Sequence, residues 1–177
     1  MLKTTSRKIN SEHLGFYQSC KSIDLSGKSL SNILDFILTN SQSNLNSYWL
    51  GRIDYSEAWK LQKVIQENVI NKKINDVILF LEHDSVYTLG KNADLNNLLP
   101  ARPKDIDVIQ TDRGGEITYH GPGQLVGYPI IDLKKYRRSI TWFMRSLEQS
   151  IIEMLNEINI SSTRKEGLTG VWVNDHK

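Results

Sequence analysis

The chain has 177 residues, of which 39% are hydrophobic and 24% are charged, as in an ordinary globular domain large enough to bury a core. Its net charge of +2 is too small to indicate a nucleic-acid partner, and no apolar run approaches the roughly 20 residues of a membrane helix. The single cysteine, Cys20, excludes an internal disulfide framework. The basic amino-terminal segment lacks the apolar core of a secretory signal. We expect a cytoplasmic monomer, or a mitochondrial one if the source is a eukaryote.

Residues 1–45 differ in composition from the rest of the chain. The stretch "SLSNILDFILTN" predicts a short amphipathic helix, and the polar "SQSNLNS" after it is typical of a linker. We therefore expect residues 1–45 to be an extension and linker outside the core. Residues 46–177 then form the main domain.

A second helix is predicted after the short apolar strand around "YWLG". Asp54 can accept hydrogen bonds from free backbone N–H groups, and Glu57, three residues later, can reach back, which is a capping-box arrangement. The helical face that follows is apolar, at Ala58, Leu61, Ile65 and Val69.

The remaining elements are mostly predicted strands. The apolar run "DVILFLEH" is typical of a buried strand, and "SVYTLG", "IDVIQTD" and "QLVGYPIIDL" predict three more. Proline cannot donate to a ladder, so the last of these is expected to be bulged or at an edge. A long amphipathic helix is predicted over residues 140–158. The order predicts an α/β or α+β domain with one main mixed sheet flanked by helices.

The segment "GVWVNDHK" predicts a strand that enters a turn at Asn174-Asp175. No strand follows that could pair with it, and an unpaired apolar strand promotes aggregation. We therefore expect the domain to be incomplete at its carboxyl end.

The segment "RGGEITYHGPGQLVGYP", residues 113–129, has five glycines and two prolines. Glycines let the backbone turn sharply and approach a ligand closely, and Arg113 offers a planar cation to an anionic or carbonyl group. Directed hydrogen bonds are available from Thr118, Tyr119, His120 and Gln124. The spacing is that of neither a P-loop nor a dinucleotide-binding loop. The alternative interpretation is a tight hairpin with a buried histidine, but the density of functional groups favours a binding loop.

These residues carry a resemblance. "RGGEITYHGPGQLVGYPIIDL" resembles the signature of the lipoate-biosynthetic octanoyltransferases, also called lipoyl(octanoyl) transferases or lipoate-protein ligase B. "DYSEAWKLQ", "LEHDSVYTLGKNADL" and "GLTGVWVNDHK" match in the family's order, so the resemblance runs from Trp49 to Lys177. It implies a fold similar to the catalytic domain of biotin and lipoate protein ligases.

The resemblance also implies the reaction and its partners. An octanoyl group passes from octanoyl-acyl carrier protein, through a thioester on an enzyme cysteine, to a lysine of lipoyl domains of 2-oxoacid dehydrogenases or of glycine cleavage H protein. Lys177 matches the lysine that lowers the pKa of that cysteine. No cofactor or metal is implied, and the spacing of His, Cys, Asp and Glu suggests no metal site. The substrate-binding residues implied are Arg113, Gly114, Gly115, Glu116, Ile117, Thr118, Tyr119 and His120.

The chain departs from the family at the nucleophile. The family's cysteine lies beyond the "GVWV" segment, where this sequence has ended, and Cys20 lies outside the matching region. We expect Cys20 to be an ordinary thiol and the 177-residue chain alone to be inactive. Two alternatives stay open: a non-catalytic module that binds acyl groups or lipoyl domains, and an ATP-dependent lipoate or biotin ligase. His83 is expected to play a supporting role at most.

Overall fold

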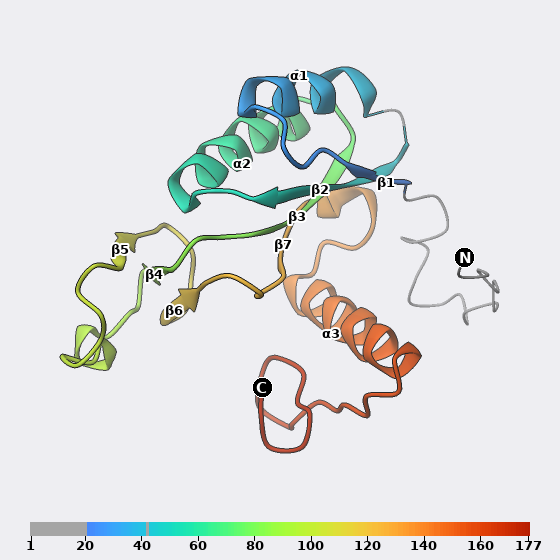
Figure 1. Cartoon of the computed structure of the whole chain (residues 1–177). Helices are drawn as coiled ribbons and strands as arrows, with labels where there is room; N and C mark the ends of the chain where they lie inside the picture. Colours follow the sequence, from blue (N-terminus) through green and yellow to red (C-terminus); the bar gives the residue numbers. More distant parts are fainter. Residues whose placement is uncertain (1–20, 42) are drawn as a thin grey trace. The chain divides into compact units, whose positions relative to one another are not determined.

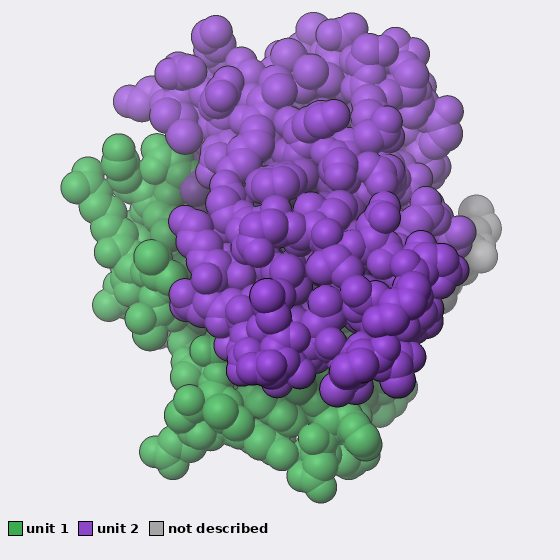
Figure 2. All heavy atoms as spheres, turned by 90° about the vertical axis from the view of Figure 1, so that its left-hand side faces the viewer, with its two compact units in different colours: residues 1–18, 132–177 green, residues 19–131 purple. Residues whose placement is uncertain are grey.

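The computed structural model describes residues 21–41 and 43–177 of the protein. Their contacts divide the chain into two compact units, shown in different colours in Figure 2. We call residues 21–131 the sheet unit and Asp132–Lys177 the carboxyl unit. Each unit is described by itself.

The sheet unit contains a four-stranded mixed sheet with strand order β1-β2-β3-β7. The first three strands are parallel, and β7 runs antiparallel to β3 (Figure 1). The proline of β7, Pro129, is tolerated because β7 is an edge strand, which confirms one of the two predicted positions. The strands are β1 (Lys21–Asp24), β2 (Leu45–Arg52), β3 (Asp76–Glu82) and β7 (Val126–Ile130).

A second, three-stranded sheet with strand order β5-β4-β6 belongs to the same unit. It consists of β4 (Val86–Leu89), β5 (Asp107–Gln110), parallel to β4, and β6 (Ile117–His120), antiparallel to β4. Between β4 and β5 lies a short 3-10 helix, η1 (Leu95–Asn97). The predicted mixed α/β class is confirmed. The strands form two sheets and not the one main sheet expected, because β4 pairs with β5 and β6 and does not join the sheet that contains β3.

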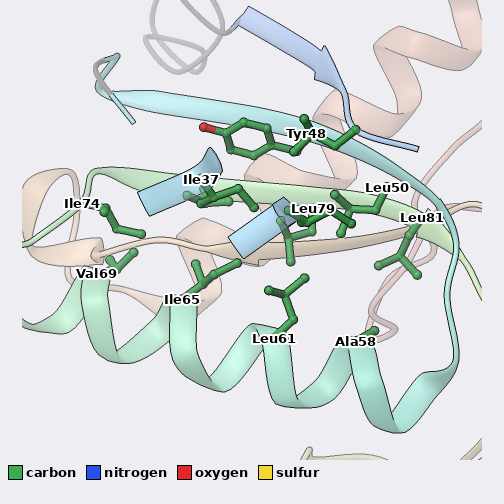
Figure 3. Packing of buried hydrophobic residues seen from close by; sticks show 13 residues of the cluster. Ile37, Tyr48, Leu50, Ala58, Leu61, Ile65, Val69, Ile74, Leu79 and Leu81 are labelled. Atoms are coloured by element: carbon green, nitrogen blue, oxygen red, sulfur yellow. The ribbon is translucent and has the colours of Figure 1, made fainter. Parts of the chain in front are cut away.

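Helices α1 (Leu30–Asn40) and α2 (Tyr55–Ile70) lie on the same face of the four-stranded sheet (Figure 1). The Asp54 carboxylate accepts a hydrogen bond from the backbone N–H of Glu57 at 3.0 Å, which confirms the predicted helix start. The predicted apolar face of α2 is also confirmed. It packs against β2 and β3 in Figure 3 through four buried residues, Ala58, Leu61, Ile65 and Val69.

The described part of the amino-terminal segment packs into this core. Leu25, Ile33 and Ile37 are buried in the same cluster as the apolar face of α2, and β1 pairs with β2. The expectation of an extension outside the core is therefore wrong for residues 21–45. Ile33 and Ile37 share an apolar face with the partly buried Leu30, Leu34 and Leu38, a pattern that predicts an amphipathic helix but not the surface against which it packs. Residues 1–20, which include Cys20, lie outside the described residues. The limits of a catalytic domain stay a prediction.

The carboxyl unit contains η2 (Leu133–Lys135) and the long helix α3 (Ile140–Glu157), which confirms the predicted helix. The "GVWVNDHK" segment forms isolated bridges, Thr163 with Trp172 and Val173 with His176, in place of the predicted strand. The predicted turn is present, because Val173 and His176 exchange backbone hydrogen bonds and Asn174 has a φ of +54°.

The packing of α1 yields a stability prediction. The Ile37 side chain has no exposed surface, whereas Ile70 at the end of α2 is 68% exposed. We expect Ile37→Ala to lower the free energy of unfolding by about 2–5 kcal/mol, because it leaves a cavity in the core. The matched control Ile70→Ala should change it by less than about 0.5 kcal/mol. Urea denaturation measures both, and equal effects would show that α1 is not part of the core.

Candidate functional site

The Gly121-Pro122-Gly123 motif forms a tight turn after β6. The backbone N–H of Gln124 donates to the Gly121 carbonyl at 3.1 Å, and Gly123 has a φ of +83°. Proline at the second position and a positive φ at the third define a type II turn, which requires glycine at that third position. The motif therefore reverses the chain between β6 and β7.

Gly115 is needed for a different reason. Gly115 has a φ of +88°, which an L side chain rarely adopts, and its carbonyl lies against Gly90 with no room for a side chain there. The backbones of Gly115 and Gly90 thus lie in close contact, while Gly121 lies against the Tyr119 ring.

Arg113 bonds to the protein's own backbone. Its Nη2 donates to the Thr88 carbonyl and the Glu116 carbonyl, both at 2.8 Å, and its Nη1 donates to the Gly114 carbonyl at 3.0 Å. The hydroxyl oxygens of Thr88 and Thr118 lie 2.9 Å from Nη2. Arg113 therefore organises the loop through these bonds, and its expected role in substrate binding stays a prediction.

His83, at the end of β3, is fully buried, and both its ring nitrogens are engaged. Nδ1 lies 2.8 Å from the Ile53 carbonyl, and Nε2 lies 2.8 Å from the Tyr128 hydroxyl. A carbonyl only accepts, so Nδ1 carries the hydrogen and the Tyr128 hydroxyl donates to Nε2. Burial lowers the pKa of His83 and raises the pKa of Tyr128, which keeps both side chains uncharged at neutral pH.

His120, at the end of β6, completes a cluster of aromatic rings. Its ring stacks on Tyr55 with centroids 5.9 Å apart and meets the His83 ring edge-on at 5.6 Å. Burial lowers the pKa of His120, against the opposing effect of a hydrogen bond to Gln124. We call His83, His120, Tyr55 and Tyr128 the His–Tyr cluster. It is an uncharged surface with directed polar groups, suited to a ligand that is mainly apolar.

The other predicted loop residues have structural partners. Glu116 Oε2 accepts from the backbone N–H of Asp94 at 3.1 Å, and Ile117 lies opposite Leu89 in the β4–β6 pair. The Tyr119 hydroxyl, in a side chain that is 45% exposed, lies 2.9 Å from Ser85 Oγ.

Sequence reasoning did not place Tyr55 and Tyr128 beside the two histidines, and the supporting role expected of His83 stays a prediction. Tyr55 and Tyr128 lie inside the motifs "DYSEAWKLQ" and "LVGYP", which was the available signal. Periodicity could not show that Tyr55 on α2 lies against His120, or that Tyr128 on β7 lies against His83.

Lys177 belongs to the carboxyl unit, where its side chain lies along Gly170. Gly170 has a φ of +134°, and a Cβ there would come within 2.5 Å of Lys177 Cε. Lys177 Nζ lies 5.7 Å from the centroid of the buried Trp172 ring, a cation–π distance. The "GVWV" segment therefore fixes the stem of Lys177 and leaves its ammonium at an aromatic face.

Glu148 on α3 fixes the start of that segment. Its carboxylate, 4% exposed, accepts from the Gly170 N–H at 2.8 Å and forms ion pairs with Arg145 at 2.7 Å and Arg164 at 2.9 Å. Burial opposes ionisation, but the hydrogen bonds from Arg145, Gly170 and Arg164 outweigh it and hold the pKa of Glu148 below its ordinary value.

Residues 21–41 and 43–177 contain no group of three or more His, Cys, Asp or Glu side chains arranged to hold a metal ion. None of their helices is both long enough and apolar enough to cross a membrane.

Comparison with known proteins identifies the family. A model of the lipoyl protein ligase A/B catalytic domain matches residues 54–177. The chain is 44% identical over 128 residues to an octanoyltransferase of Gloeobacter violaceus, covering 72% of this chain and 57% of the relative. It is 45% identical over 139 residues to an octanoyltransferase of Flavobacterium psychrophilum, covering 70% of this chain and 60% of the relative. The chain belongs to the lipoyl protein ligase A/B catalytic domain family, and spans about six tenths of the length of these relatives.

The two adjacent glycines provide a matched test of the loop. Gly115→Ala forces a side chain into a left-handed conformation, which costs about 1–2 kcal/mol. Gly114 has no positive φ, and a Cβ there meets nothing within 4 Å. We expect Gly114→Ala to change the free energy of unfolding by less than about 0.5 kcal/mol in the same urea titration. If the two variants lose equal stability, the proposed loop conformation is incorrect.

Glu148 gives the carboxyl unit a defined pH dependence. Because its folded-state pKa is depressed, its contribution is present above the ordinary value of 4.5 and is lost as pH falls through the folded pKa. We expect the stability difference between the wild-type chain and Glu148→Gln, measured by urea unfolding, to shrink as pH falls below 4.5. Glu157→Gln, an exposed site on the same helix, is the control. A difference that is constant from neutral to acid pH would contradict this prediction.

Proposed function

We propose that this chain belongs to the catalytic domain of an octanoyltransferase. Such an enzyme moves an octanoyl group from acyl carrier protein to a lysine of a lipoyl domain. The observation that carries the proposal is the loop at residues 113–124, ordered by Arg113 beside the uncharged His–Tyr cluster. That loop lies within the segment matched by the family model, and the relatives compared above are named octanoyltransferases.

The proposed reaction has two acyl transfers. A cysteine thiolate attacks the octanoyl thioester of the carrier, so that a new C–S bond forms, the old C–S bond breaks and the carrier sulfur leaves as thiolate. The neutral lysine amine of the lipoyl domain then attacks the enzyme thioester, forming an amide, and the cysteine sulfur leaves as thiolate. The amine gives up one proton in this step, which balances the proton taken up by the carrier thiolate. Neither step consumes ATP or needs a metal, and the resemblance places the cysteine after the "GVWV" segment.

The proposed acyl site is the segment Arg113 to His120 with the His–Tyr cluster. A buried, uncharged surface suits an eight-carbon chain, because each methylene removed from water contributes about 0.8 kcal/mol. Arg113 contributes by holding the loop carbonyls in place, and His120 contributes a polar group at the edge of the cluster.

The proposed role of Lys177 is to stabilise the cysteine thiolate. An ammonium beside a thiol favours the thiolate and lowers the pKa of that thiol. Among the described residues, Nζ of Lys177 forms no ion pair with a carboxylate, and its stem is held against Gly170. Its charge is therefore not neutralised within that part of the chain.

The proposed partners are octanoyl-acyl carrier protein and the lipoyl domains of 2-oxoacid dehydrogenases and of glycine cleavage H protein. The cytoplasm, or the mitochondrion in a eukaryote, is where the proposal places the reaction. The surface run Lys134, Lys135, Arg137 and Arg138 of the carboxyl unit offers positive charge to an acidic carrier.

A transfer assay separates this proposal from its two alternatives. Residues 1–177 are joined to the part of the Gloeobacter violaceus relative that follows its matched segment, because the resemblance places the cysteine there. We expect this chimera to transfer octanoyl from the carrier to a lipoyl domain without ATP, detected as octanoyl-lysine by mass spectrometry. Lys177→Ala in the chimera should lower the rate of thioester formation, with the exposed Lys72→Ala as control.

The alternatives predict other outcomes in the same assay. Attachment of free octanoate that requires ATP and Mg²⁺ would indicate a ligase and contradict the proposal. Capture of the acylated carrier or the lipoyl domain with no transfer by the chimera would indicate a non-catalytic binding module.

A further inference from the structure

The hydrogen bonds of His120 determine which of its ring nitrogens carries the hydrogen. His120 Nδ1 lies 2.8 Å from Gln124 Oε1. The other end of the same amide, Gln124 Nε2, lies 3.3 Å from the Tyr119 carbonyl. A carbonyl only accepts, so the amide nitrogen must face Tyr119 and the amide oxygen must face His120. The reversed amide would place two acceptor oxygens against each other.

The amide orientation leaves one tautomer for the neutral imidazole. Because Gln124 Oε1 only accepts, His120 Nδ1 must donate, and Nε2 keeps its lone pair. Among residues 21–41 and 43–177, no hydrogen-bond partner of His120 Nε2 is found. The ring is only partly buried, so this lone pair is an unused acceptor in the candidate site.

The type II turn determines where Gln124 lies. Gln124 N–H closes the turn onto Gly121, and the Gly123 N–H donates to Glu82 Oε2 at 3.0 Å. The turn is thus tied to the end of β3, next to His83. Three residues separate His120 from Gln124, and the reversal brings the amide back to the imidazole. The Gly-Pro-Gly motif therefore serves to orient a histidine as well as to reverse the chain.

We propose that Gln124 is a positioning residue that fixes His120 in the Nδ1–H tautomer and presents Nε2 as a hydrogen-bond acceptor to the substrate. The identity of the substrate group that Nε2 contacts rests on the proposed function. This group is a polar N–H, such as that of the lysine amine that attacks the thioester.

The groups that surround His120 are compatible with an acceptor. Tyr55 stacks on its ring from α2, His83 meets it from the end of β3, and Arg113 is the nearby cation. Burial is the main cause that lowers the pKa of His120, and Arg113 acts in the same direction. A neutral imidazole at neutral pH is required if Nε2 is to accept a hydrogen bond.

The test is ¹⁵N NMR of the histidine rings in the 177-residue chain, with the His120 signals assigned by their loss in His120→Phe. We expect hydrogen on Nδ1 and a bare Nε2 in the wild-type chain. Gln124→Leu removes the acceptor and should move the hydrogen to Nε2. His83 is an internal control, because the Ile53 carbonyl fixes its Nδ1–H independently of Gln124.

The outcomes separate this inference from the proposed function. If His120 keeps hydrogen on Nδ1 in Gln124→Leu, or carries it on Nε2 in the wild-type chain, the inference is overturned whatever the chain catalyses. In the transfer assay, Gln124→Leu should lower kcat by about 100-fold with a smaller change in KM. An unchanged kcat in Gln124→Leu, with the tautomer switched, would overturn the acceptor role of Nε2.

Discussion

The guanidinium group of Arg113 satisfies the carbonyl oxygens of a loop that has too few ladder partners of its own. A segment rich in glycine and proline forms few regular hydrogen bonds, so its carbonyl oxygens need donors from outside a strand ladder. Arginine has five donors in a fixed plane, and here they reach β4 at Thr88 and the loop at Gly114 and Glu116. A lysine could not replace them, because its three donors radiate from one point. The left-handed turn at Gly115 and the start of β6 both depend on this arrangement.

A second constraint is that the rings beside the loop stay uncharged. His83 donates to the Ile53 carbonyl and accepts from Tyr128, so the buried pair satisfies its own polar atoms without ionising. Leaving one of these atoms without its partner would cost about 1–3 kcal/mol, so the pair holds β3 and β7 in a fixed relation. An apolar chain can then lie against the cluster without desolvating a charge. The structure agrees with the proposed function here, because an octanoyl chain is best bound by an uncharged surface from which water is excluded.

Much of the fold follows from local patterns in the sequence. The α2 face, its Asp54 start, the buried strand β3 and the long helix α3 are each set by residues close together in the chain. The division of the strands into two sheets does not follow from local patterns, because it depends on which strands, distant in the sequence, pair with each other. The burial of Ile33 and Ile37 could not be predicted either, since an amphipathic pattern predicts an apolar helix face but not the surface against which that face packs.

The candidate site shows the same division between local and distant information. The glycines that turn the loop were recognised from the sequence, because positive φ and tight turns favour that residue. The partners of Arg113 and His120 could not be recognised from the sequence, since Thr88, Tyr55 and His83 belong to other parts of the chain. A resemblance can indicate that a residue belongs to a site, but it cannot show whether the side chain faces a ligand or the protein's own backbone.

The central claim is that the segment Arg113 to His120, with the His–Tyr cluster, holds the acyl chain. Photo-crosslinking tests it most directly, with carrier protein bearing an octanoyl analogue that has a diazirine at the end of the chain. The account predicts labelled peptides within residues 113–128 or at Tyr55 and His83, with labelling competed by octanoyl carrier but not by unacylated carrier. Labelling confined to other surfaces, such as the exposed Leu95 and Leu99 around η1, would contradict the account.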